Sequence, residues 1–318
     1  MDKSLQNIVY QLISDQLLSW ETAGKNYGAL AHIQSKRIDF SGFHMEVQFN
    51  PERARSTTAP VGTAVERPCF LCTANRPPEQ ESIRWKEYDM LVNPYPIFNP
   101  HLTIPATKHI PQFLTGKIRD MVKLSAELPD FVLTFNGARS GASAPDHFHF
   151  QAVGRDVLPA QKELPCWKLR SVLYDDTDIS VWGADDYGRP AIIVAGKTAA
   201  QTAQTAENVL AELKGIMQQP DEAQVNALAW MDGCTYTIVF FLRTAHRPRQ
   251  YYAAGEEQFL SSPGAVDMAG VVITVREQDY QKIFAPIIDD LFSQVVPIGT
   301  EWERIKTELS LCLTKNLK

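Results

Sequence analysis

The stretch FNGARSGASAPDHFHFQ, residues 135 to 151, joins a loop of small residues to a run in which polar and aromatic residues alternate. In an extended strand, residues two apart point to the same face. We therefore expect His147, His149 and Gln151 to share one side of a strand, while the two phenylalanines between them face an apolar layer. An imidazole held beside a bound phosphate can attack phosphorus and form a covalent nucleotidyl-histidine. The alternative is a half-buried strand whose histidines only fill a polar face.

The loop before this strand is rich in small residues, namely Gly137, Ser140, Gly141, Ala142 and Ser143. Residues of this size allow a ligand to approach the backbone closely, and successive N–H groups of such a loop can bind a phosphate. The sequence therefore predicts a phosphate-binding loop directly before the candidate nucleophile.

This segment resembles the active-site segment of the histidine-triad superfamily, in its transferase and phosphorylase branches. The hydrolase branch has His-x-His-x-His, whereas galactose-1-phosphate uridylyltransferases, diadenosine tetraphosphate phosphorylases and GDP-hexose phosphorylases have His-x-His-x-Gln, as here. By this resemblance, His149 is the nucleophile, and Gln151 hydrogen-bonds the phosphoryl group of the intermediate. Asn136 and Gly137, followed by the Ser-Gly-Ala-Ser loop, are similar to the loop of the phosphorylases in particular.

The resemblance implies an α+β fold with two histidine-triad-like halves, each an antiparallel sheet covered by helices. We expect residues 1–165 to form the catalytic half and residues 166–318 to form a second half that contributes to substrate binding. The predicted helices cover residues 1–20, 112–128, 198–217, 277–293 and 299–315. The predicted strands lie within residues 36–50, 88–106, 131–135, 170–174, 178–183, 190–195, 224–230, 234–243 and 264–270.

The composition is that of an ordinary globular protein, with 44% hydrophobic and 21% charged residues among 318. A net charge of −6 argues against a general nucleic-acid or membrane binder. No apolar run approaches the length needed to span a bilayer. The N-terminal segment is amphipathic and differs from a secretory signal, so we expect a cytoplasmic protein.

Cys69 and Cys72 are the only close pair among five cysteines. Thiolates at this spacing can occupy two vertices of a tetrahedral zinc site, although a free dithiol is the alternative. The segment resembles the Cys-Phe-Leu-Cys segment of galactose-1-phosphate uridylyltransferases, in which two histidines complete a structural metal site. That resemblance implies His109 and His147 as the other ligands, with His101 as the substitute for His109. We expect Zn²⁺, and no organic cofactor.

Several basic and amide residues are candidate substrate contacts. Arg53 and Arg55 follow a strand on a loop and could clamp a diphosphate, although a solvated basic turn is the alternative. This segment is similar to one in the GDP-hexose phosphorylases. The same resemblance implies that Asn93 and Lys108 contact the nucleotide; otherwise they are a turn residue and a solvated lysine.

Residues 240–249 contain three arginines and a histidine directly after an apolar strand. Charge runs of this kind are usually exposed loops. Together with the strand expected at 264–270, however, the segment is similar to the carboxy-terminal half of the GDP-hexose phosphorylases. We therefore predict that Arg243 holds a sugar phosphate or a phosphate acceptor.

The expected activity is nucleotidyl transfer from a nucleoside diphosphate-hexose to phosphate or a sugar phosphate, through a nucleotidyl-His149 intermediate, with sugar 1-phosphate released. The attacking nitrogen must be unprotonated, so the other ring nitrogen is expected to donate to a backbone carbonyl. Unlike a histidine, Gln151 cannot protonate a leaving alkoxide, which favours transfer over hydrolysis. The alternatives are a hexose-1-phosphate uridylyltransferase, a diadenosine tetraphosphate phosphorylase and a non-catalytic nucleotide-binding module. No nucleic acid or membrane partner is expected, and a homodimer is left open.

Overall fold

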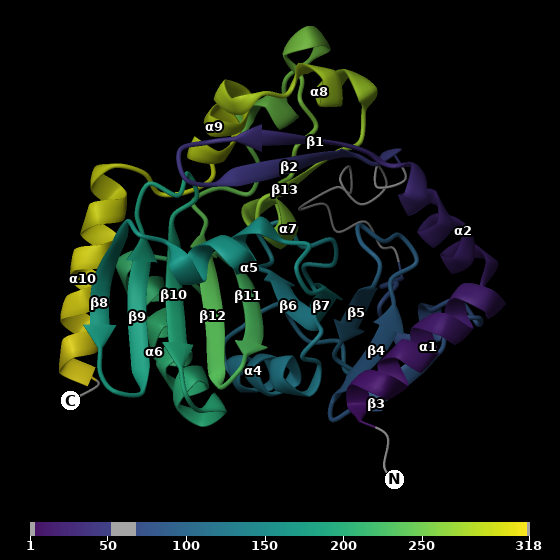
Figure 1. Ribbon diagram of the computed structural model, residues 1–318, viewed down its shortest axis with the longest axis horizontal. Helices are drawn as coiled ribbons and strands as arrows, with labels where there is room; N and C mark the ends of the chain where they lie inside the picture. Colours follow the sequence, from purple (N-terminus) through teal and green to yellow (C-terminus); the bar gives the residue numbers. More distant parts are fainter. Residues whose placement is uncertain (1–3, 52–67, 317–318) are drawn as a thin grey trace.

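The structure is a computed structural model that describes residues 4–51 and 68–316 (Figure 1). Its centre is a ten-stranded antiparallel sheet with the strand order β3-β4-β5-β7-β6-β11-β12-β10-β9-β8. The strands are β3 (Ser82–Trp85), β4 (Tyr88–Val92), β5 (His101–Pro105), β6 (Phe131–Asn136), β7 (His149–Gly154), β8 (Arg170–Asp175), β9 (Ile179–Ala184), β10 (Ala191–Gly196), β11 (Val225–Asp232) and β12 (Thr235–Leu242). Helices cover this sheet, so the fold is α+β, as predicted.

The two halves of the chain meet in the middle of this sheet. The first half supplies β3 to β7 and the second half supplies β8 to β12, and they join where β6 pairs with β11. In this antiparallel pair Asn136 lies opposite Asn226. The end of β6, from which the predicted phosphate loop starts, therefore lies against the second half. A boundary at residue 165 stays a prediction.

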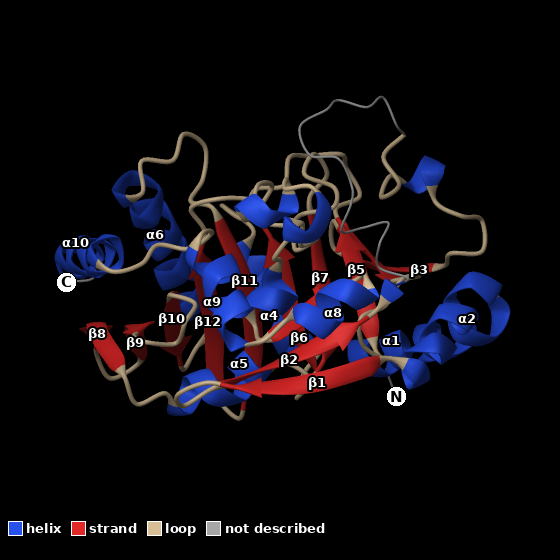
Figure 2. Ribbon diagram, turned by 90° about the horizontal axis from the view of Figure 1, so that it is seen from above, coloured by secondary structure: helices blue, strands red, loops and turns tan. Residues whose placement is uncertain are grey.

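A second, three-stranded sheet consists of β1 (Gln34–Asp39), β2 (His44–Phe49) and β13 (Val271–Thr274). Figure 2 shows β1 and β2 on one side of the large sheet, with α6 and α10 on the other. The helices are α1 (Leu5–Ser19), α2 (Glu21–Ala29), α4 (Ile118–Glu127), α5 (Pro159–Glu163), α6 (Ala199–Ile216), α7 (Ala265–Met268), α8 (Glu277–Lys282), α9 (Ala285–Ser293) and α10 (Thr300–Asn316). Helices α1 and α10 lie at opposite ends of the large sheet (Figure 1). Among the described residues, no helix combines the length and apolar character that crossing a membrane requires.

Both faces of the large sheet are buried, which explains why its central strands are almost continuously apolar. Phe131 and Leu133 of β6 belong to the core layer that includes α4, α6 and α10, whereas Val132 belongs to the layer beneath β2 and β13. Phe148 and Phe150 are fully buried in the first of these layers, which confirms their predicted packing. Burial of each such side chain contributes roughly 1.5–3 kcal/mol to stability.

Three predicted elements differ from the observed ones in where they begin or in how they are divided. Strand β7 begins at His149, two residues later than the alternation predicted. The predicted helix over 112–128 begins only at Ile118, after the left-handed residue Gly116. The predicted helix over 277–293 is divided between α8 and α9.

The predicted strand over 264–270 is wrong, because Ala265–Met268 form the short helix α7 and β13 begins only at Val271. The Asp267 side chain accepts a hydrogen bond from Gly264 N at the start of this helix. The side chain of Asn136, which is distant in sequence, accepts another from Ala265 N. Groups that cap a helix from another part of the chain leave no local pattern in its sequence.

Candidate active site

His149 is the first residue of β7, and only 2% of its surface is exposed. Its Nδ1 lies 2.9 Å from the backbone oxygen of His147. Because a carbonyl oxygen can only accept, Nδ1 carries the proton and Nε2 keeps its lone pair. Burial lowers the pKa of His149 to about 4, so the ring is uncharged at neutral pH. This is the tautomer and charge state that an attacking imidazole requires.

Gln112 holds His149 in place through its side-chain amide. Its Oε1 accepts a hydrogen bond of 2.7 Å from His149 N, and its Nε2 donates to the carbonyls of His149 and Asn136 at 3.0 and 2.9 Å. The residue is almost completely buried. Sequence reasoning missed Gln112; its only signal is its place in a segment, residues 108–112, that is similar to one in the phosphorylases.

Gln151 is oriented by His101, the first residue of β5. His101 Nδ1 accepts a hydrogen bond from Ile97 N at 3.1 Å, so its Nε2 carries the proton. That Nε2 donates to Oε1 of Gln151 at 2.8 Å. The opposite end of the Gln151 amide is therefore Nε2, which offers N–H donors to an anionic ligand. His101, the substitute metal ligand in the prediction, thus lies in this hydrogen-bond chain instead.

The predicted phosphate loop is a tight turn pressed against the second half of the chain. Gly137 N donates to Val225 O, and Ser140 N donates back to Gly137 O. Gly141 has φ +89°, and a Cβ there would lie 2.8 Å from Gly264 Cα, so only glycine fits. Gly141 N and Ala142 N make no hydrogen bond with other described residues. They are the backbone donors that the loop can offer to a phosphate.

Arg243 does not have the predicted role of a phosphate contact. Its side chain is completely buried, and the five N–H groups of its guanidinium all donate to protein acceptors. These acceptors are Val295 O, Asn226 Oδ1, Pro263 O, Ala245 O and His246 O. No donor of Arg243 therefore remains for a phosphate, and its guanidinium instead binds other parts of the protein.

The other predicted substrate contacts are Arg53, Arg55, Asn93 and Lys108. Arg53 and Arg55 lie outside the described residues. Asn93 lies beside His101, and its Oδ1 accepts a hydrogen bond from Tyr95 N at 2.9 Å, as in a turn. Lys108 is exposed, one residue before His109. For Asn93 and Lys108, nucleotide contact stays a prediction.

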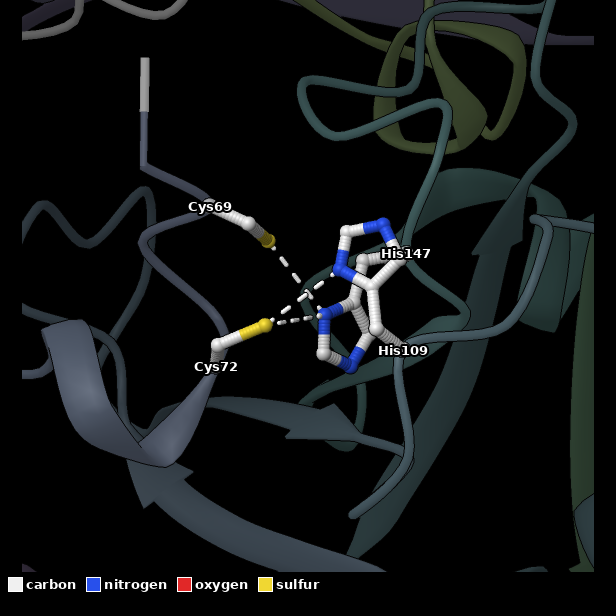
Figure 3. Close-up of side chains that lie close together, drawn as sticks. All are labelled: Cys69, Cys72, His109 and His147. Carbon is white, nitrogen blue, oxygen red and sulfur yellow. Dashed lines mark hydrogen bonds between the residues drawn. The ribbon is translucent and has the colours of Figure 1, made fainter. Parts of the chain in front are cut away.

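Cys69, Cys72, His109 and His147 form a cluster that could hold a metal ion (Figure 3). Their ligand atoms all lie within 4.8 Å of one another. Cys69 Sγ lies 3.3 Å from His147 Nδ1, and Cys72 Sγ lies 3.3 Å from His109 Nδ1 and 3.5 Å from His147 Nδ1 (Figure 3). The structure therefore brings together the four ligands that the resemblance implied.

The surroundings of the two histidines suit metal binding. His147 Nε2 donates to Ala106 O at 2.8 Å, and His109 Nε2 lies 3.3 Å from an oxygen of Asp146. Such partners hold the proton on Nε2 and leave Nδ1 as the ligand. Arg76 joins the segment that carries Cys69 and Cys72 to the large sheet. It donates to Leu71 O and forms a buried ion pair of 2.8 Å with Asp89 of β4.

Comparison with known proteins agrees with this fold. A family model described as "Domain of unknown function (DUF4922)" matches residues 12–154, and no curated protein matches the sequence. Yeast Ap4A phosphorylase Apa2 in complex with Ap4A has a similar structure, with a TM-score of 0.63, 14% identity, and 93% of this chain and 98% of that chain covered. A second structure of yeast Apa2 gives a TM-score of 0.60 and 16% identity over 93% and 95% of the chains. A uridylyltransferase structure has a TM-score of 0.48 and 14% identity, with 90% of this chain and 100% of that chain covered.

The chain therefore has the fold of yeast Ap4A phosphorylase Apa2, which agrees with the histidine-triad-like fold that the His-x-His-x-Gln segment predicted. This fold spans most of the chain and includes strands from both halves.

Proposed function

We propose that this protein is a nucleotidyltransferase that works through a covalent bond between His149 and a nucleotide. The observation that carries the proposal is the state of His149: its Nδ1 proton is directed at a carbonyl, and its Nε2 lone pair is free to react. A histidine that only filled a buried polar face would be expected to have both ring nitrogens hydrogen-bonded. The orientation of Gln151 and the open N–H groups of the loop support the same reading.

In the first step, Nε2 of His149 attacks the α-phosphorus of a nucleoside diphosphate-hexose. The bond between this phosphorus and the bridging oxygen breaks, and hexose 1-phosphate leaves with the electron pair. Nε2 of Gln151 and the loop N–H groups stabilise the charge on the nonbridging oxygens. A phosphate leaving group needs no proton, so the absence of a third histidine is no obstacle.

In the second step, an oxygen of inorganic phosphate attacks the same phosphorus, and the bond to Nε2 breaks. The products are a nucleoside diphosphate and a free histidine, ready for another cycle. A sugar phosphate could act as acceptor in the same way, which would make the enzyme a hexose-1-phosphate uridylyltransferase. We favour phosphate because the Ser-Gly-Ala-Ser loop resembles that of the phosphorylases.

We further propose that the cluster of two cysteines and two histidines holds Zn²⁺. Two thiolates and two imidazoles are a donor set that zinc prefers in structural sites. The ion would fix the segment before β7, because His147 supplies both a ligand and the carbonyl that accepts the hydrogen bond from Nδ1 of His149. The chemistry itself would remain with His149 and Gln151.

A second candidate is a dinucleoside polyphosphate phosphorylase. The fold likeness to yeast Ap4A phosphorylase, which spans 93% of this chain, favours it. The same nucleophile and loop could serve both donors, because each contains an α-phosphorus with a phosphate leaving group.

A phosphorolysis assay tests the proposal and separates the candidates. The protein would be incubated with GDP-, UDP- or ADP-hexose, or with diadenosine tetraphosphate, with and without phosphate, and the nucleotides separated by chromatography. We expect phosphate-dependent formation of a nucleoside diphosphate and hexose 1-phosphate. Activity should disappear in His149→Ala and persist in His44→Ala, whose ring pairs with Glu163 at 2.8 Å elsewhere in the fold. Binding of a nucleotide without turnover of any donor would instead support a non-catalytic module.

A further inference from the structure

We propose that Asn226, held by Arg243, is a positioning residue through which the second half of the chain sets the phosphate loop, residues 137–143. This inference rests on the proposed function, because it concerns how the loop presents its donors to the transferred phosphoryl group. Neither residue would touch the substrate.

Asn226 lies on β11 and is completely buried. Its Oδ1 accepts a hydrogen bond of 2.6 Å from Arg243 Nη1. Its Nδ2 donates to Ser140 O in the loop and, at 2.8 Å, to Asn136 Oδ1 at the start of the loop. Because a guanidinium can only donate, Oδ1 must face Arg243 and Nδ2 must face the loop. Arg243 therefore decides the orientation of this amide.

Arg243 is itself fixed by its surroundings. Its other donors bind the carbonyls of Val295, Pro263, Ala245 and His246. Desolvation lowers the pKa of Arg243 to about 10, which still leaves it charged at neutral pH. A buried charge of this kind persists only where its hydrogen-bond donors are satisfied. The guanidinium is thus a fixed donor that holds Asn226 in one orientation.

Two carbonyls of the loop are held by protein donors, one of them by Asn226. Ser140 O is bound by Asn226, and Gly137 O is bound by Ser140 N. A carbonyl oxygen facing a phosphate would repel it, whereas the N–H groups of Gly141 and Ala142 attract it. Holding the carbonyls within the protein therefore leaves the donors for the phosphoryl group.

Asn136 is oriented by the same network. Its Oδ1 accepts from Asn226 Nδ2 and from Ala265 N, so the oxygen end of the amide is occupied. Its Nδ2 makes no hydrogen bond with another described residue. Asn136 therefore keeps a side-chain donor, and its backbone carbonyl is joined to that of His149 through Gln112 Nε2.

The variant Asn226→Asp keeps the contact with Arg243 and removes the N–H donors to Ser140 and Asn136. A carboxylate can still accept from Arg243, but it has no N–H for Ser140 O or Asn136 Oδ1, and its charge repels both oxygens. We expect the single-turnover rate of nucleotidyl-His149 formation to fall about 100-fold, as for other small displacements of catalytic groups. Arg243→Met should give a similar loss of rate together with a large loss of stability.

The matched control is Gln16→Leu, which removes another buried amide with two backbone hydrogen bonds, to Glu79 O and from Glu81 N on the far side of the first half. Thermal unfolding of both variants would show how much stability each change costs. If Gln16→Leu lowers the rate as much as Asn226→Asp at equal loss of stability, the role of Asn226 is only structural. A rate for Asn226→Asp equal to that of the wild type would also overturn the proposal.

Hydrogen exchange provides a readout that does not depend on catalysis. We expect amides in residues 137–148 to exchange faster in Asn226→Asp than in the wild type, and to be unchanged in Gln16→Leu. An exchange rate in Asn226→Asp equal to that of the wild type would contradict the proposal that Asn226 orders the loop. If the wild type formed no nucleotidyl-histidine with any donor, the proposed function would fail, while the exchange measurement would still decide whether Asn226 orders the loop.

Discussion

His101 donates a hydrogen bond of 2.8 Å to Oε1 of Gln151, and this contact decides which end of the Gln151 amide can face a substrate. The proton of His101 is placed in turn by Ile97 N, which donates to Nδ1. His101, which lies 50 residues before Gln151 in the sequence, thus turns a glutamine that could present either an oxygen or a nitrogen into a donor.

Replacing His101 with phenylalanine removes this donor while filling the buried space. We expect kcat to fall by about 10- to 100-fold, since a rotated Gln151 would present its oxygen to the phosphoryl group. The KM for the nucleotide donor should change little. Steady-state kinetics with the preferred donor would measure both constants, and a wild-type kcat would contradict the assigned orientation of Gln151.

Replacing Gln112 with leucine removes three hydrogen bonds that hold His149 and the start of the loop. Buried backbone groups would be left unpaired, so we expect a loss of about 2–4 kcal/mol in the free energy of unfolding. The rate of nucleotidyl-His149 formation should also fall. Urea unfolding and single-turnover kinetics would test these two effects. A variant with the stability and the rate of the wild type would show that the hydrogen bonds of Gln112 are dispensable.

Removing a metal ion from the cysteine and histidine cluster should destabilise the first half of the chain. We expect about one zinc per chain by elemental analysis, and a Tm several degrees lower after chelation, because structural zinc contributes directly to folding. Cys72→Ser should abolish metal binding, while Cys234→Ser, at an exposed cysteine outside the cluster, should not. A chain that binds no zinc, and whose Tm is unaffected by a chelator, would refute the metal site.

Gly141 and Gly116 offer a matched pair for the role of the loop. Both have positive φ, +89° and +77°, but a Cβ would clash with Gly264 only at Gly141 and would meet open space at Gly116. Alanine at either position costs about 1–2 kcal/mol in backbone strain. We expect a loss of nucleotidyl transfer only in Gly141→Ala. Equal activities in an assay of both variants would show that the close approach of the loop to Gly264 is not required.

Much of the fold follows from periodicity that is visible in the sequence. The alternation at 147–151 predicted the buried phenylalanines, and apolar runs predicted nearly every strand of the large sheet. The spacing of Cys69 and Cys72 indicated half of a metal site, and the family resemblance supplied the two histidines.

The remaining features depend on contacts between distant parts of the chain. Gln112 and Asn226 are single amides in no repeating pattern, and their roles arise only when β6 pairs with β11 and β7. Arg243 is predicted as a phosphate contact because the basic run after an apolar strand, together with residues 264–270, resembles the carboxy-terminal half of the GDP-hexose phosphorylases. In the structure, carbonyls from three separate segments enclose it. Such enclosure cannot be inferred from local sequence.

The most direct test of the central claim is the mass of the intact protein after incubation with a nucleotide donor in the absence of phosphate. Acid must be avoided, since it cleaves the bond between phosphorus and imidazole nitrogen. We predict a gain equal to one nucleoside monophosphate residue in the wild type and in His44→Ala, no gain in His149→Ala, and loss of the adduct when phosphate is added. An adduct that persists in His149→Ala, or no adduct with any donor that the protein consumes, would contradict a nucleotidyl-His149 intermediate.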